Sequence, residues 1–93
     1  MKAKVILFSY KNDEINNFLN KFYSNNSQSS DGSSWQKEFS NPVEISEIVA
    51  AFADNSNSFD LIMWVSLDKD VFIKISSSNV NHFIKYLFER YPY

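Results

Sequence analysis

Short apolar segments with two different periods alternate with polar residues along this chain. Apolar residues at consecutive or alternate positions predict four β-strands, over residues 4–10, 35–40, 59–67 and 71–75. The first of these is apolar on both faces, so we expect it to be buried on both sides or nearly so. The second places Lys37 between Trp35 and Phe39 and is polar on its other face, which is typical of an edge strand.

The last two predicted strands are expected to form a hairpin, and side-chain alternation decides between two turns. A two-residue turn pairs Val65 with Phe72 and mixes the apolar and polar faces. A three-residue loop, Asp68–Asp70, pairs Val65 with Ile73 instead. It keeps together one apolar face, made of Leu61, Met63, Val65, Leu67, Val71, Ile73 and Ile75. We therefore predict the three-residue loop.

Apolar residues three and four positions apart predict three amphipathic helices. They cover about 13–23, from Pro42 to near Asp54, and about 79–90. Their apolar stripes are Ile15, Phe18, Leu19 and Phe22; Ile45, Ile48, Val49 and Phe52; and Val80, Phe83, Ile84 and Leu87, joined by Phe88 and Tyr91. The predicted N-caps are Asn12, Asn41, and Ser77 or Ser78. Pro42 suits the first helical position, and Glu44 completes a capping-box-like pattern.

The predicted order βαβαββα indicates an α+β or α/β fold. We expect a two- or three-layer sandwich of about four strands and three helices, with a C-terminal β-hairpin followed by a helix. A length of 93 residues fits a single domain, 1–93. Residues 24–34 contain no apolar side chain and include the one glycine of the chain, so we expect a mobile Ser/Asn-rich loop there.

Apolar side chains also fall on the second face of the predicted sheet. They are Ile6, Phe8, Tyr10, Ile62, Trp64 and Phe72. Either one of the helices covers this face or it forms an exposed patch that requires a partner. The sequence pattern leaves both arrangements open.

The composition excludes several classes of function. The chain has no cysteine, one histidine and one glycine, which excludes thiolate catalysis, multi-histidine metal centres and glycine-rich phosphate loops. We therefore expect no cofactor and no bound metal. The net charge is −2, the lysines are scattered and Arg90 is the one arginine, so nucleic-acid binding is not expected. No apolar stretch reaches the length of a membrane helix and no signal peptide is recognisable, so we expect a cytoplasmic protein.

Two groups of residues offer candidate chemistry, and each also has a simpler interpretation. Asp68 and Asp70 place two carboxylates at the predicted hairpin tip, as a magnesium-dependent hydrolase would require. Aspartate is equally typical of a solvated turn. His82 is a possible general base, but it falls off the apolar stripe of the last helix, where a surface histidine is expected. We assign no catalytic residue.

The aromatic content of 17% points instead to binding, because Trp and Tyr dominate protein interfaces. The candidate partner-binding residues are Trp35, Trp64, Phe72, Tyr91 and Tyr93. A core position is the alternative for Trp35 and Trp64. The leading hypothesis is a small non-enzymatic protein–protein interaction domain, either a homodimer or a binder or inhibitor of a larger and possibly basic partner. The alternatives are the hydrolase based on Asp68 and Asp70, and a small-molecule binder near Trp64.

Overall fold

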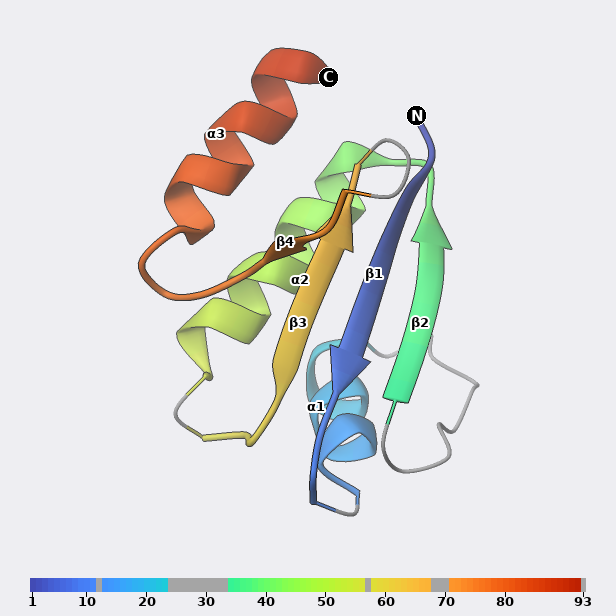
Figure 1. Cartoon of the computed structure of the whole chain (residues 1–93), viewed down its shortest axis with the longest axis vertical. Helices are drawn as coiled ribbons and strands as arrows, with labels where there is room; N and C mark the ends of the chain where they lie inside the picture. The colour runs from blue at the N-terminus through green and yellow to red at the C-terminus, as the bar shows by residue number, and fades with distance from the viewer. Residues whose placement is uncertain (12, 24–33, 57, 68–70, 93) are drawn as a thin grey trace.

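The computed structural model describes residues 1–11, 13–23, 34–56, 58–67 and 71–92. Four antiparallel strands form one sheet in the order β2-β1-β3-β4 (Figure 1). They are β1 (Ala3–Phe8), β2 (Ser34–Phe39), β3 (Ile62–Ser66) and β4 (Ile73–Lys74). The order βαβαββα is confirmed, and the antiparallel pairing makes the fold α+β. The expected edge position of β2 is confirmed as well.

The strand register follows from side-chain alternation. On the central pair, Val5 lies opposite Val65. On the last pair, Val65 lies opposite Ile73, as the three-residue connection requires, although residues 68–70 themselves lie outside the described part of the chain. Val71 departs from the expectation that it shares the buried face. It is 74% exposed, because β4 begins only at Ile73 and the chain before it is not paired in the sheet.

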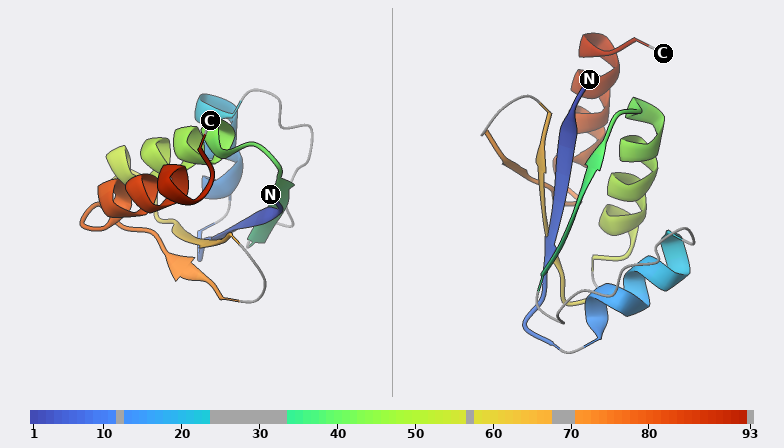
Figure 2. Two further views of the ribbon diagram at one scale, coloured as in Figure 1. Left: turned by 90° about the horizontal axis from the view of Figure 1, so that it is seen from above. Right: turned by 90° about the vertical axis from the view of Figure 1, so that its right-hand side faces the viewer.

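Three helices pack against the same side of this sheet, so the fold has two layers (Figure 2). They are α1 (Glu14–Phe22), α2 (Pro42–Asp54) and α3 (Val80–Arg90). The predicted apolar stripes face the core: Ile15, Phe18, Leu19, Ile45, Ile48, Val49, Phe52, Val80, Phe83 and Leu87 are all buried. Phe18 is fully buried at the centre of an aromatic cluster and lies 5.2 Å from Phe22 and 5.7 Å from Phe59 between ring centroids. This cluster fixes α1 against the chain that enters β3.

Only one of the three predicted helix caps is confirmed. The Asn41 side chain accepts a hydrogen bond from the Val43 N–H (2.8 Å), with Pro42 at the first position of α2. The N-cap of α1 is Asp13, not Asn12, and its backbone is left-handed with φ 67°. The N-cap of α3 is Asn79 rather than a serine, and its side chain bonds to the preceding chain rather than to the helix. The predicted mobile loop, residues 24–34, lies outside the described residues except for Ser34.

Candidate functional site

The side of the sheet that faces away from the helices, here called the open face, carries a central apolar row. The register places Phe8 opposite Ile62 and Ile6 opposite Trp64 on the two middle strands. By alternation, the open face consists of Lys4, Ile6, Phe8, Ser34, Gln36, Glu38, Ile62, Trp64, Ser66 and Lys74. Its polar members lie mainly on the outer strands, so the apolar residues have a polar rim.

No described segment of the chain covers the open face, since α1, α2 and α3 all lie on the opposite side (Figure 2). Phe8 is 41% exposed and Phe72 is 37% exposed, while Ile6, Ile62 and Trp64 are half-buried among their neighbours. A shallow hollow of about 500 Å³ opens on this face. It is lined by Phe8, Ser9, Tyr10, Ser34, Ile62, Trp64 and Lys74. Of the two arrangements that the sequence left open, a covering helix is not found among the described residues.

Trp64 lies on the open face, where alternation places it; Phe72 precedes β4 and is 37% exposed. Trp35 does not join Trp64. It is 6% exposed, lies across from Leu7 in the register, and packs edge-to-face on Tyr23 at 6.2 Å between ring centroids. Odd-numbered residues of β2 point toward the helices, so Trp35 is a core residue and its side chain is not accessible to a partner.

The remaining candidates do not converge on the open face. Tyr91 is the C-terminal cap of α3, half-buried against the core on the helix side of the sheet. Tyr93 lies outside the described residues, and so do Asp68 and Asp70. The hydrolase hypothesis based on that carboxylate pair is therefore neither supported nor contradicted by the structure.

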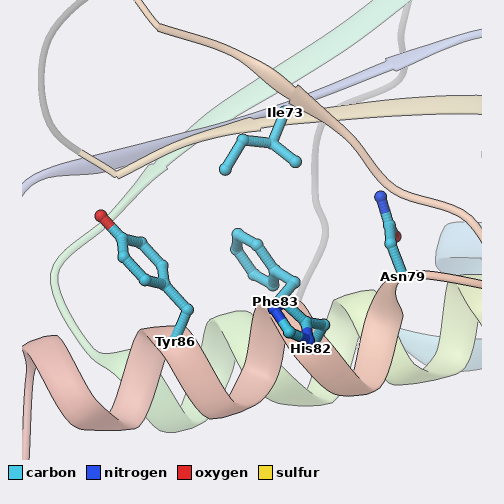
Figure 3. Close-up of a pocket in the computed structure, with 5 residues that line it drawn as sticks. All are labelled: Ile73, Asn79, His82, Phe83 and Tyr86. Carbon is cyan, nitrogen blue, oxygen red and sulfur yellow. The ribbon is translucent and has the colours of Figure 1, made fainter.

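A second recess, here called the edge groove, separates β4 from α3 (Figure 3). Its volume is about 300 Å³ and its lining consists of Ile73, Asn79, His82, Phe83 and Tyr86. Ile73 points from β4 toward α3, where the Phe83 ring lies opposite it (Figure 3). Sequence reasoning missed this groove. The available signal was Tyr86, a large aromatic residue that falls off the apolar stripe of α3 and is 45% exposed.

The segment that forms the edge groove differs in charge from the rest of the protein. Residues 71–88 contain no aspartate or glutamate, although the whole chain has eleven acidic residues. Lys74 on β4 and Lys85 on α3 are both exposed, and His82 lines the groove. Carboxylates flank this segment in the sequence, at Asp70 and at Glu89, which is one helical turn after Lys85.

The described residues offer little for catalysis. Among them, no three His, Cys, Asp or Glu side chains lie close enough to hold a metal ion. His82 is exposed, as predicted, and no hydrogen bond to it is formed by the described part of the chain. Within the same ranges, no helix combines the length and the apolar character needed to span a bilayer.

Comparison with known proteins leaves the chain without a relative to guide interpretation. No protein-family model, curated protein or solved structure matches it.

Proposed function

We propose that this protein is a small, non-enzymatic interaction domain that docks another protein on the open face of its sheet. The observation that carries the proposal is that all three helices lie on one side of the sheet, while Phe8, Ile62 and Trp64 lie on the other. An apolar aromatic centre with a polar rim is the usual anatomy of a protein–protein interface. Because the chain is acidic and has no cysteine, we place this interaction in the cytoplasm.

Burial of the exposed aromatic surface would contribute favourably to the free energy of binding a partner. Phe8 leaves 41% of its surface in water, which is about 80 Å² for a side chain of roughly 200 Å². At about 25 cal/mol per Å², covering it contributes roughly 2 kcal/mol. Trp64 and Ile62 add to this contribution. A partner that covers the whole row gains enough to offset part of the entropy lost on association.

A photoreactive phenylalanine analogue at Phe8 tests this proposal in cells that make the protein at its natural level. We expect a covalent adduct with a protein, and we expect Trp64→Glu in the same chain to abolish it. The matched control carries the photoreactive group at Glu47, an exposed position of α2 on the helix side. Absence of any protein adduct at Phe8, or equal adducts at both positions, would refute the proposal. Sedimentation of the purified protein then shows whether the occupant is a second copy or a different chain.

The hollow beside Trp64 supports a second candidate, a small-molecule binder. Its volume of about 500 Å³ lies in the range of ligand sites, and its lining mixes aromatic groups with Ser9, Ser34 and Lys74. A Trp35→Phe variant leaves Trp64 as the one tryptophan, so its fluorescence reports on the hollow alone. A saturable change with a member of a metabolite library would favour this candidate. An unchanged spectrum across the library would exclude its members as ligands.

A further inference from the structure

The apolar centre of the open face is a block of four side chains that straddles the line between β1 and β3. Ile6 lies opposite Trp64, and Phe8 lies opposite Ile62, in the register of these two strands. Phe8 is 41% exposed, and the other three side chains are half-buried. Each strand contributes two of the four residues, so the block is apolar to the same depth on both sides of that line.

The two outer strands carry opposite charges on the open face. Glu38 is exposed on β2 at one edge of the sheet, and Lys74 is exposed on β4 at the other edge. The third charged residue, Lys4, lies on β1 in the row that also holds Glu38 and Ser66. The open face is therefore acidic at one edge, basic at the other and apolar in the middle.

This pattern is complementary to itself under a two-fold rotation about an axis that runs parallel to the strands, between β1 and β3. The rotation reverses the strand order, so that β1 packs over β3 of a second copy and β2 packs over β4. The apolar residues then meet as Ile6 over Trp64 and Phe8 over Ile62.

The same rotation brings opposite charges together at both edges. Glu38 of each copy lies over the β4 strand of the other copy, offset from Lys74 by two residues along the strand. That offset is roughly 7 Å, which a glutamate and a lysine side chain together can span. Lys4 meets Ser66 rather than another charge. No charged residue of the open face is thus placed against a like charge.

The alternative two-fold axis runs across the strands and fits the charges less well. It places β2 over β2 and β4 over β4, which gathers the two Glu38 side chains at one edge and the two Lys74 side chains at the other. Like charges that face each other across an interface are destabilising. Charge therefore selects the axis that runs parallel to the strands.

The size of the open face sets the strength expected of such a pairing. Four strands about 4.8 Å apart and about six residues long give a projected area of roughly 400 Å² on each copy. The total of roughly 800 Å², somewhat more once the relief of the side chains is included, lies at the small end of specific interfaces. We therefore expect a reversible dimer with a dissociation constant of about 10–100 μM.

We infer that the open face is the interface of a two-fold homodimer, in which two sheets pack face to face and the helices form the outer layers (Figure 2). The inference rests on the proposed function and names the partner as a second copy of this chain. Both copies use the same patch, as a two-fold interface requires.

Charge exchange on the whole protein, followed by sedimentation equilibrium, tests the inference. Glu38→Lys and Lys74→Glu should each weaken self-association about tenfold, because each reverses one partner of two symmetric ion pairs. The double variant Glu38→Lys/Lys74→Glu should restore the dimer of the parent, since its two edges have exchanged signs. Its net charge is again −2, so total charge does not explain the restoration.

The single variants also separate this pairing from general repulsion. Glu38→Lys removes the net charge of −2 and would strengthen association if overall charge alone governed it. Glu47→Lys makes the same change on the helix side, at an exposed position of α2, and should not weaken association.

Three results would overturn the homodimer. The first is a parent protein that stays monomeric at concentrations about tenfold above the expected dissociation constant. The second is a dimer that does not respond to Glu38→Lys and Lys74→Glu, and the third is a double variant that remains as weak as the single ones. A monomer whose photoreactive Phe8 captures a different protein would refute the homodimer and leave the proposed docking surface intact. Absence of any adduct at Phe8 would refute both.

Discussion

The two tryptophans lie on opposite sides of one sheet, so their replacement by alanine should have very different effects on stability. Trp35 is 6% exposed and packs between the sheet and Tyr23. Removing a buried aromatic side chain costs about 3–5 kcal/mol through lost burial and the cavity left behind. A domain of 93 residues has a total stability of roughly 5–14 kcal/mol. Trp35→Ala therefore removes a large part of the free energy of unfolding.

Trp64→Ala should lower the free energy of unfolding much less, by about 1 kcal/mol. Trp64 is half-buried on the open face, where it contacts cross-strand neighbours but no helix. A cross-strand pair with an aromatic residue contributes about 0.2–1 kcal/mol, and truncation at a solvent-facing position leaves no closed cavity. Trp35→Phe and Trp64→Phe are the conservative controls, and they should preserve most of the stability at each position.

Urea denaturation followed by circular dichroism at 222 nm measures both effects. With a slope of about 1.5 kcal/mol per M, Trp35→Ala should lower the midpoint by about 2–3 M. Trp64→Ala should lower it by less than about 1 M. Equal shifts of the two midpoints, or a larger shift for Trp64→Ala, would show that the two sides of the sheet have been assigned the wrong way round. Trp64 would then lie in the core, and the open face would not be the docking surface.

Three further substitutions test local features. Asn41→Ala should lower the free energy of unfolding, measured by thermal denaturation, by about 1 kcal/mol because it removes the N-cap hydrogen bond of α2. The control Asn20→Ala, on the exposed side of α1, should leave stability unchanged or raise it slightly. Because Asp13 has a φ of 67°, the Asp13→Gly variant should be at least as stable as the parent protein, and Asp13→Val should be about 1–2 kcal/mol less stable. Differential scanning calorimetry measures this ranking, and the opposite order would contradict the left-handed backbone at this position. Asn79→Ala should lower the free energy of unfolding, measured by urea denaturation, by about 1–3 kcal/mol because two hydrogen bonds are lost. An equal decrease for Asn81→Ala, at an exposed position, would argue against the Asn79 bridge to β4.

Local periodicity predicted the elements of this fold well. The apolar stripe of α2 was predictable because a helix presents every third or fourth residue to the core. Its cap at Asn41 was predictable because the first N–H groups of a helix need an acceptor. The pairing of Val65 with Ile73 was also readable, because a one-residue slip would have moved every apolar side chain to the other face. These features depend on residues that are close in sequence.

The caps of α1 and α3 were predicted wrongly for a shared reason. A sequence with many asparagines and serines offers several acceptable caps in a row, and local preference does not rank them. Asn79 is the cap of α3, and its side chain bonds to Lys74 and Ser76 rather than to the helix, which local preference does not predict. Asp13 became the cap of α1 in a left-handed conformation that aspartate tolerates.

The sequence predicted only part of the candidate site. Alternation placed Trp64 on the second face of the sheet, but it left open whether Trp35 meets a partner or the core, where its ring lies. Gln36, Glu38 and Lys74 share the face of Trp64, and these polar residues were the available sign of which face meets solvent. The sequence could not predict the edge groove, because the groove forms between α3 and β4 and depends on how these two elements pack.

The sequence by itself determined the seven elements, their apolar faces and the register of the hairpin, because periodicity fixes which side chains point the same way. Only the tertiary structure decided that β1 lies between β2 and β3 and that all three helices cover the face of Val5 and Leu7. Both faces of the central strands are apolar, so burial of either would have satisfied the local pattern. The choice depended on packing between residues distant in sequence, and it left Phe8 and Trp64 on the open face.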